Sequence, residues 1–224
     1  MVKPYLALIA LALCACATQE IDTAEPLPNI VIVYTDDQGW QDVGVYGAID
    51  FSTPNLDRLA SEGVRFTDFY VSQPVCSASR ASLLTGCYAN RLDIHGALNP
   101  NSENGLKPSE VTIAELCKQR GYATANYGKW HLGNREEFLP TRQGFDTFEG
   151  IPYSNDMWPK HPESPKAYPP LPYLIDETIV RHMPDQSQFT TDFTNLTTKF
   201  MRKSHAAGTP FFVYLAHPMP HVPL

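Results

Sequence analysis

The sequence has no excess of basic residues, because 17 Lys and Arg stand against 24 Asp and Glu among 224 residues, giving a formal net charge of -7 at pH 7. Proteins that bind nucleic acid through its phosphates need clustered Lys and Arg. We therefore expect no nucleic acid as the main partner, although this balance leaves room for a local basic pocket that binds a small anion. The sequence has no internal repeat, and its length suits one large core or one domain of a longer protein.

The sequence also lacks an apolar run long enough to cross a bilayer as a mature helix. The early run Tyr5–Ala17 has the length of a signal-peptide core instead. Its end, Leu13-Cys14-Ala15-Cys16-Ala17, carries a small-x-small cleavage site and also resembles a bacterial lipoprotein site; a buried N-terminal helix is the alternative. We predict a signal peptide over residues 1–17, a linker over 18–28, and export to the periplasm or cell exterior, with a lipid anchor as the one expected membrane link.

Cysteine is scarce after this leader, where Cys76, Cys87 and Cys117 occur and no CxxC pair is found. The lack of CxxC weighs against zinc-ribbon and thioredoxin-type sites. Three cysteines leave at least one outside any intramolecular disulfide, and the sequence does not decide whether Cys87 and Cys117 pair. Cys76 opens the stretch CSASRASLLTG, where three interpretations compete: a structural cysteine, a thiolate nucleophile, or the precursor of a modified residue.

Apolar runs alternate with amphipathic segments along the rest of the chain. Buried strands are predicted over residues 29–34, 122–127 and 211–216, and a half-buried strand over 64–70. Helices are predicted over 53–63 with Thr53 as N-cap and Leu56 and Leu59 facing inward, 78–85 with Ser77 as N-cap, 110–120 with Ser109 as N-cap, and 191–204. The alternation predicts an α/β fold with a mostly parallel sheet. Between 151 and 189 the pattern lapses, and so long a loop is usually functional or disordered.

Polar and titratable residues follow each of the three buried strands. Asp36 and Asp37 follow the first, and two adjacent carboxylates suit calcium or magnesium, with an ordinary Asp-rich turn as the alternative. Lys129 and His131 follow the second and face the same side if the strand continues, which suits an anionic substrate and proton transfer. The segment His217-Pro-Met-Pro-His221 follows the third strand. Its two histidines could serve as acid, base or ligand, or the segment could be a rigid Pro-rich turn in which the histidines have no role. Ligands bind outside the carboxyl ends of such strands, so we expect one shared site.

The spacing between Cys76 and Arg80 tests the thiolate interpretation. Cys76 lies at a predicted helix N-terminus, which favours anions and lowers the pKa of a thiol, and Arg80 is about one turn further on. A cysteine-dependent phosphatase needs five residues between its Cys and Arg. Here three residues intervene, and Ser82 occupies the position that an arginine would require. The spacing therefore disfavours a thiolate phosphatase.

These motifs, with GYATANYGKWHLG, GFDTFEGIPYSND and the final LAHPMPHVPL, resemble the sulfatase family, the formylglycine-dependent type with an alkaline-phosphatase-like fold. The resemblance runs from Asn29 to Leu224, and Cys-x-Ala-x-Arg followed by GKWHLG is a highly specific combination. Ala78 stands where the family most often has Pro. The resemblance implies an α/β/α sandwich with a mostly parallel central sheet, of which residues 29–224 form the N-terminal part of the catalytic domain.

The resemblance also implies a role for each matching residue. Cys76 would be oxidised to formylglycine (3-oxoalanine) by a dedicated maturation enzyme, and its aldehyde hydrate would be the nucleophile. Asp36, Asp37 and residue 76 would hold a calcium ion, and Arg80 would stabilise the hydrate. The roles near the substrate would fall to four further side chains: sulfate binding to Lys129, a hydrogen bond near the centre to Ser154, regeneration of the aldehyde to His131, and protonation of the departing alcohol to His221.

The resemblance leads us to expect an exported, calcium-dependent hydrolase of aryl or carbohydrate sulfate esters. Its expected partners are a sulfated small molecule or glycan and the formylglycine-generating enzyme. In the family a second Asp and Asn ligand pair and a second sulfate-binding Lys lie downstream of the PHxP motif, so we expect this chain to be the N-terminal part of a longer protein. Two alternatives stay open: a phosphoester or phosphonate hydrolase of the same superfamily, and a non-catalytic protein that binds sulfated glycans.

Overall fold

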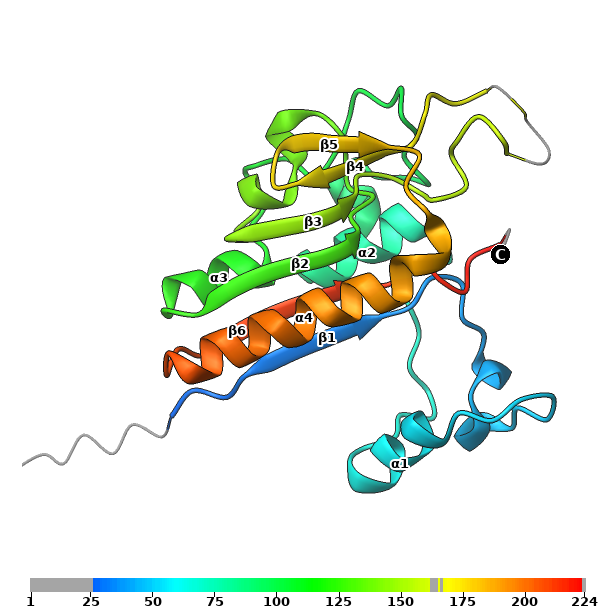
Figure 1. Ribbon diagram of the computed structural model, residues 1–224, viewed down its shortest axis with the longest axis vertical. Helices are drawn as coiled ribbons and strands as arrows, with labels where there is room; N and C mark the ends of the chain where they lie inside the picture. The colour runs from blue at the N-terminus through cyan, green and yellow to red at the C-terminus, as the bar shows by residue number, and fades with distance from the viewer. Residues whose placement is uncertain (1–25, 162–164, 166, 223–224) are drawn as a thin grey trace, which may run out of the picture.

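The computed structural model describes residues 26–161, 165 and 167–222. In that part of the chain a six-stranded sheet has the order β1-β6-β2-β3-β4-β5 (Figure 1). The strands are β1 (Ile30–Tyr34), β2 (Ala123–Lys129), β3 (Thr147–Ile151), β4 (Pro172–Ile175), β5 (Thr178–His182) and β6 (Phe211–Ala216). The pairs β1–β6, β6–β2 and β2–β3 are parallel, whereas β3–β4 and β4–β5 are antiparallel. The predicted α/β fold with a mostly parallel sheet is confirmed.

Helices cover both faces of the sheet. The helices are α1 (Pro54–Glu62), α2 (Cys76–Thr85), α3 (Ile113–Gln119) and α4 (Phe189–Ala206). Residues of α2 and α3 share one apolar cluster with Phe212 and Tyr214 of β6, whereas α4 packs Phe189 and Phe193 on the opposite face with Val213. Figure 1 shows α4 in front of β2 and β6, with α2 and α3 behind them. This arrangement is an α/β/α sandwich, as the sequence predicted.

Strand β6 shows how the sequence specifies its own position. All six of its residues are buried, and successive side chains point to opposite faces of a sheet. Phe212 and Tyr214 therefore enter the cluster below α2, while Val213 and Leu215 enter the cluster below α4. A strand that is apolar on both faces belongs in the middle of a parallel sheet. β6 lies between β1 and β2, and its predicted bounds, 211–216, are confirmed.

Two helix starts differ from the predictions. α3 begins at Ile113 and not at 110, because Thr112 forms a capping box in which its hydroxyl accepts from the Glu115 N–H and the Glu115 carboxylate accepts from the Thr112 N–H. α2 begins at Cys76 with Val75 as N-cap, so Ser77 lies inside the helix and does not cap it. Its predicted end is confirmed, since Gly86 adopts the left-handed conformation, with φ of 69°.

The predictions for strands 29–34 and 64–70 need correction. β1 is not buried on both faces, since Val31 and Val33 are 39% and 60% exposed. Residues 64–70 form no strand, because no neighbouring strand in the described part of the chain pairs with them. The interval 151–189 is not one loop, because it holds the antiparallel hairpin of β4 and β5. β4 and β5 extend the sheet beyond β3, and the sequence pattern predicted none of these three strands.

Helix α1 does not pack on the sheet. Thr53 is its N-cap residue, as predicted, but its hydroxyl accepts from the Gly44 N–H and caps no helical N–H. Leu56 and Leu59 are 41% and 65% exposed, so the predicted inward stripe is wrong for this chain. Figure 1 shows α1 apart from the sheet and beyond the edge strand β1. No helix among the described residues is long and apolar enough to span a membrane. The predicted signal peptide (1–17) and most of the linker (18–28) lie outside the described residues.

Gly128 allows β2 to lie against β6 just before Lys129. Its φ is +114°, and a Cβ atom there would come within 1.9 Å of the Ala216 carbonyl oxygen. We expect Gly128→Ala to lower the free energy of unfolding by about 3 kcal/mol or more, because left-handed strain adds to a backbone clash. Chemical denaturation measures this loss.

The matched control is Gly121→Ala. Gly121 also has a positive φ, +82°, but a Cβ atom there would meet nothing within 4 Å. We expect the control to cost only about 1 kcal/mol, the strain alone. Equal losses in the two variants would contradict the close approach of β2 and β6.

Candidate active site

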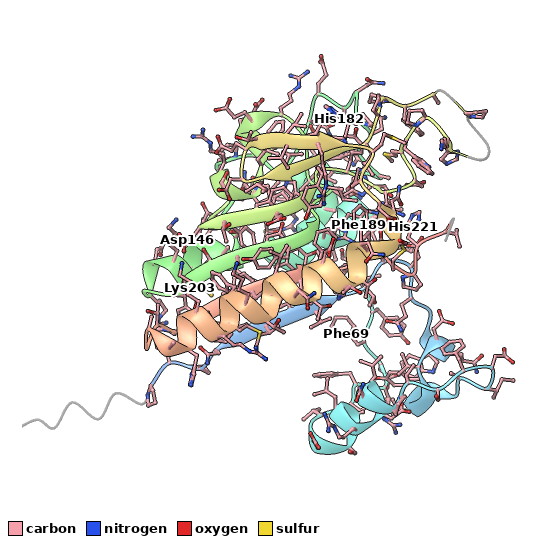
Figure 2. The ribbon with its side chains drawn as sticks, viewed as in Figure 1. Phe69, Asp146, His182, Phe189, Lys203 and His221 are labelled. Carbon is pink, nitrogen blue, oxygen red and sulfur yellow. The ribbon has the colours of Figure 1, made fainter. Side chains whose placement is uncertain are left out.

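The residues predicted to carry chemistry meet at the carboxyl edge of the parallel strands. Asp36 follows β1, Lys129 ends β2, His221 lies after β6, and Cys76 begins α2. His221 is labelled at this edge in Figure 2. Backbone hydrogen bonds tie the segment after β6 to the end of β1, from the His217 N–H to the Tyr34 carbonyl (2.8 Å) and from the Asp36 N–H to the Met219 carbonyl (3.3 Å). Open α/β sheets bind ligands at this edge.

Asp36 is the centre of a buried charge cluster. Its side chain accepts a hydrogen bond from Lys129 Nζ, and its Oδ1 lies 3.4 Å from Arg80 Nη2. Lys129 and Arg80 are fully buried, and Asp36 is 3% exposed. Burial alone would raise the pKa of Asp36, but the charges of Arg80 and Lys129 outweigh it and hold the pKa below its usual value. The carboxylate therefore stays ionised between two cations.

Arg80 is held by aromatic and backbone partners but keeps free donors. Its Nη1 donates to the Lys129 carbonyl at 2.8 Å and to the Tyr214 hydroxyl at 3.3 Å, and its guanidinium lies 5.2 Å from the centre of the Tyr34 ring. Nε is buried without a hydrogen-bond partner among the described residues, and Nη2 has only the 3.4 Å ion-pair contact with Asp36. Buried donors of a cation are costly to leave unpaired, so this face of Arg80 is suited to an anion.

Lys129 connects Ser154, which was also predicted to lie near the substrate, to the buried charge cluster. Its Nζ donates to Ser154 Oγ at 2.9 Å, and Ser154 is 1% exposed. Ser154 lies just after β3, the strand that pairs with β2, so the sheet itself places the hydroxyl beside the ammonium group. A buried ammonium with one anionic partner and one neutral partner has a third N–H available for a ligand.

His131 lies beyond the end of β2, in a conformation that breaks the strand. Its φ is +60°, which is uncommon for a residue other than glycine and often marks a functional position. Nε2 donates to the Leu98 carbonyl at 2.6 Å, and buried Nδ1 has no partner among the described residues. Burial first, and then the charge of Lys129, lowers the pKa of His131 well below its usual value. The ring is therefore neutral, and its Nδ1 carries a lone pair without a hydrogen-bond donor among the described residues.

His221 approaches Cys76 and Asp37. Its hydrogen bond with Cys76 raises the pKa of His221 to about 9, against the opposing effect of burial. Nε2 lies 3.4 Å from Asp37 Oδ2, and Nδ1 donates to the Val222 carbonyl at 2.6 Å. Asp37 also has a positive φ, 58°, and its side chain is 58% exposed. At neutral pH His221 is a protonated imidazolium beside a carboxylate and residue 76.

The site offers ligands for a cation, and its fit to calcium depends on residue 76. Asp36, Cys76 and His221 bring one ligand atom each within 4.8 Å of one another. Asp36 and Asp37 supply carboxylate oxygens, which calcium prefers, but a thiol sulfur and an imidazole nitrogen are poor calcium ligands. The carboxylates fit calcium, and an oxygen-bearing side chain at position 76 would fit it better than a thiol does.

These titratable residues were predicted from the sequence, whereas the residues that hold them in place were not. Tyr34 and Tyr214 flank Arg80, and Tyr34 also hydrogen-bonds Ser79. The alternation in β1 puts Tyr34 on the same face as Ile30 and Ile32, a signal that could have placed its hydroxyl near α2. No signal in the sequence pointed to the Leu98 carbonyl. Cys76, Cys87 and Cys117 are all free thiols, so Cys87 and Cys117 do not pair.

Fold and site together define an α/β protein with a buried cluster of charged and titratable residues at the carboxyl edge of its sheet. The family model described as Sulfatase matches residues 28–224. The chain belongs to the sulfatase family.

Two curated relatives and two solved structures illustrate the similarity. The chain is 40% identical to human arylsulfatase A over 211 residues, 88% of this chain and 42% of the relative, and 38% identical to rat arylsulfatase G over 225 residues, 91% and 43%. The chain thus spans less than half the length of these relatives. The PsFucS1 sulfatase from Pseudoalteromonas sp. aligns with a TM-score of 0.76 at 29% identity, over 88% of this chain and 44% of that one.

The second structure holds a sugar sulfate. BT4656, in complex with its substrate D-glucosamine-2-N,6-O-disulfate, aligns with a TM-score of 0.66 at 27% identity, over 87% of this chain and 35% of that one.

Proposed function

We propose that this chain forms the nucleophile-bearing part of an enzyme that hydrolyses sulfate esters. The observation that carries the proposal is the buried cluster of Arg80, Asp36 and Lys129 beside Cys76, in a chain of the sulfatase family. A sulfate ester is a stable anion, so its cleavage needs fixed positive charge and a nucleophile in one place. Lys129 Nζ and the unpartnered Nε of Arg80 would bind sulfate oxygens.

We propose that Cys76 works as formylglycine and that Asp36 and Asp37 hold calcium. When bound, the calcium ion and the aldehyde hydrate supply charge neutralisation and a hydroxyl nucleophile. Neutral His131, with its free Nδ1, would accept a proton in the step that releases sulfate. His221, which lies beside residue 76, would donate a proton to the departing alcohol.

The proposed substrates are aryl or carbohydrate sulfates, taken as a sulfated small molecule or glycan. Support comes from the arylsulfatase relatives and from the bound glucosamine disulfate of BT4656. We also propose a formylglycine-generating partner enzyme, because residues 76–80 carry the Cys-x-Ala-x-Arg motif. Export to the periplasm or cell exterior is proposed from the apolar run Tyr5–Ala17.

Turnover of matched aryl substrates tests the reaction type. The complete gene product, co-expressed with a formylglycine-generating enzyme, is assayed with an aryl sulfate and with the same aryl phosphate. The proposal predicts a much larger kcat/KM for the sulfate. Preferential release of phosphate would favour the phosphoester-hydrolase alternative, and glycan binding without release of sulfate would favour the non-catalytic one.

Ser154→Ala tests the role of the hydroxyl beside Lys129. Removing one buried hydrogen-bond partner of the ammonium group should lower kcat/KM for sulfate release about 10-fold, the equivalent of one ordinary hydrogen bond. Ser187→Ala is the control, because Ser187 is exposed and bonds only to nearby Asp185 and Gln188. Equal activity of both variants would remove Ser154 from the site.

A further inference from the structure

Asp36, Cys76 and His221 each offer one atom that could bind a metal ion, and the three atoms are different elements. Asp36 offers a carboxylate oxygen, Cys76 a thiol sulfur and His221 an imidazole nitrogen, all within 4.8 Å of one another. They lie at the end of β1, at the first turn of α2 and after β6. Sulfur, nitrogen and one oxygen form the donor set typical of zinc, which binds in a tetrahedron with three protein ligands and an open fourth position.

The His221 ring is oriented as a metal ligand usually is. Its Nδ1 donates to the Val222 carbonyl at 2.6 Å, which leaves Nε2 on the side of Asp37 Oδ2, 3.4 Å away. Histidines that ligate metals almost always donate their other N–H to a carbonyl or carboxylate. Nε2 therefore faces the carboxylates and Cys76, within 4.8 Å of the ligand atoms of Asp36 and Cys76.

The charges of the site also allow a divalent cation. Asp36, Asp37 and a coordinated thiolate would supply three negative charges, against two positive charges from Lys129 and Arg80. Each oxygen of Asp36 faces one of these cations and keeps a second lone pair. Lys129 and Arg80 weaken cation binding by repulsion but also fix the Asp36 carboxylate in place.

We propose that the unmodified chain binds Zn²⁺ through Cys76 Sγ, His221 Nε2 and the Asp36 carboxylate, and that conversion of Cys76 to an oxygen-bearing residue removes this site. Binding releases the thiol proton and the proton of His221 to the buffer. Calcium avoids sulfur and nitrogen ligands, so the chemistry of one side chain selects the metal. The lack of CxxC pairs excluded only zinc sites formed by residues close in sequence; these three ligands come from separate elements. The inference goes beyond the proposed function, because it concerns the chain before maturation.

Zinc titration of the chain produced without a maturation enzyme tests the proposal. Competition with a chromophoric chelator should give one bound Zn²⁺ per chain, with a dissociation constant about 100-fold or more below that for Ca²⁺. Cys76→Ala and His221→Ala should each weaken zinc binding at least about 10-fold. Cys87→Ser and His217→Ala are the matched controls, since neither side chain belongs to the ligand group, and both should bind zinc as the parent does.

Thiol alkylation gives a readout that needs no variant. Zinc should slow alkylation of Cys76 and leave the exposed Cys87 thiol unaffected, as measured by mass spectrometry of the two peptides. Equal alkylation of Cys76 with and without zinc, or zinc binding unchanged in His221→Ala, would overturn the proposal. Both outcomes are independent of sulfate release by the matured protein, so failure of the zinc site and failure of the proposed function are distinguishable.

Discussion

Replacing Cys76 by alanine is expected to reduce sulfate release by the matured gene product by about 10⁴-fold or more. Alanine has no atom that can become the nucleophile, while Lys129 and Arg80 still bind the substrate. The expected signature is therefore a loss of kcat with a KM close to that of the parent. Initial-rate kinetics with an aryl sulfate measure both constants.

The control for this variant is Cys87→Ala. Cys87 is an exposed free thiol directly after the Gly86 cap of the same helix, so it shares the segment but not the site. Its variant should keep the parent's activity. Near-normal sulfate release by Cys76→Ala, in protein that still unfolds cooperatively, would contradict the assignment of residue 76 as the nucleophile.

Asp36→Asn is expected to have the second largest effect. Asn keeps the shape of Asp but removes the charge that balances two fully buried cations, Lys129 and Arg80. Breaking a buried ion pair on one side costs about 3 kcal/mol or more of unfolding free energy. The variant should also lose calcium binding and reduce sulfate release about 10³-fold, because the metal would lose a carboxylate ligand.

Denaturation, calcium titration and kinetics on the same preparation separate these effects. Asp50→Asn is the matched control, since Asp50 is exposed and its variant should change none of the three measurements. Unchanged calcium affinity in Asp36→Asn would contradict the ligand assignment. Unchanged stability would contradict the buried charge cluster itself.

The central fold was predictable because β6 is apolar on both faces and the segment of β2 was also recognised as a buried strand. Such buried runs are typical of a parallel sheet, and parallel strands bring their carboxyl ends to one edge. Asp36, Lys129 and His221 were therefore expected near one another, and the structure brings them together. The roles proposed for them remain predictions.

The features that were not predictable depend on contacts between residues that a local sequence pattern does not show. The bounds of α3 follow from a reciprocal cap between Thr112 and Glu115, which competed with the plainer signal of Ser109. The hairpin of β4 and β5 is specified by its pairing with β3, not by an alternating pattern of its own. Likewise, the lone pair on His131 Nδ1 is set by the distant Leu98 carbonyl, which only the folded chain brings near.

The exposed apolar residues of β1 and α1 also show what a local pattern does not predict. Val33, Leu56 and Leu59 have the pattern of buried positions, and all three are more than two-fifths exposed in the described chain. Periodicity shows which face of an element is apolar but not whether another element covers it. The prediction that these three residues are buried was therefore wrong for the described chain.

The mass of the tryptic peptide that spans residues 66–80, from protein made in its native host, tests the central claim most directly. The account predicts a peptide lighter by the difference between a CH₂SH side chain and an aldehyde, with the change located at residue 76. It also predicts that this peptide reacts with an aldehyde-specific hydrazide. An unmodified thiol at residue 76 in all of the protein would contradict the account, because the proposed nucleophile would then be absent.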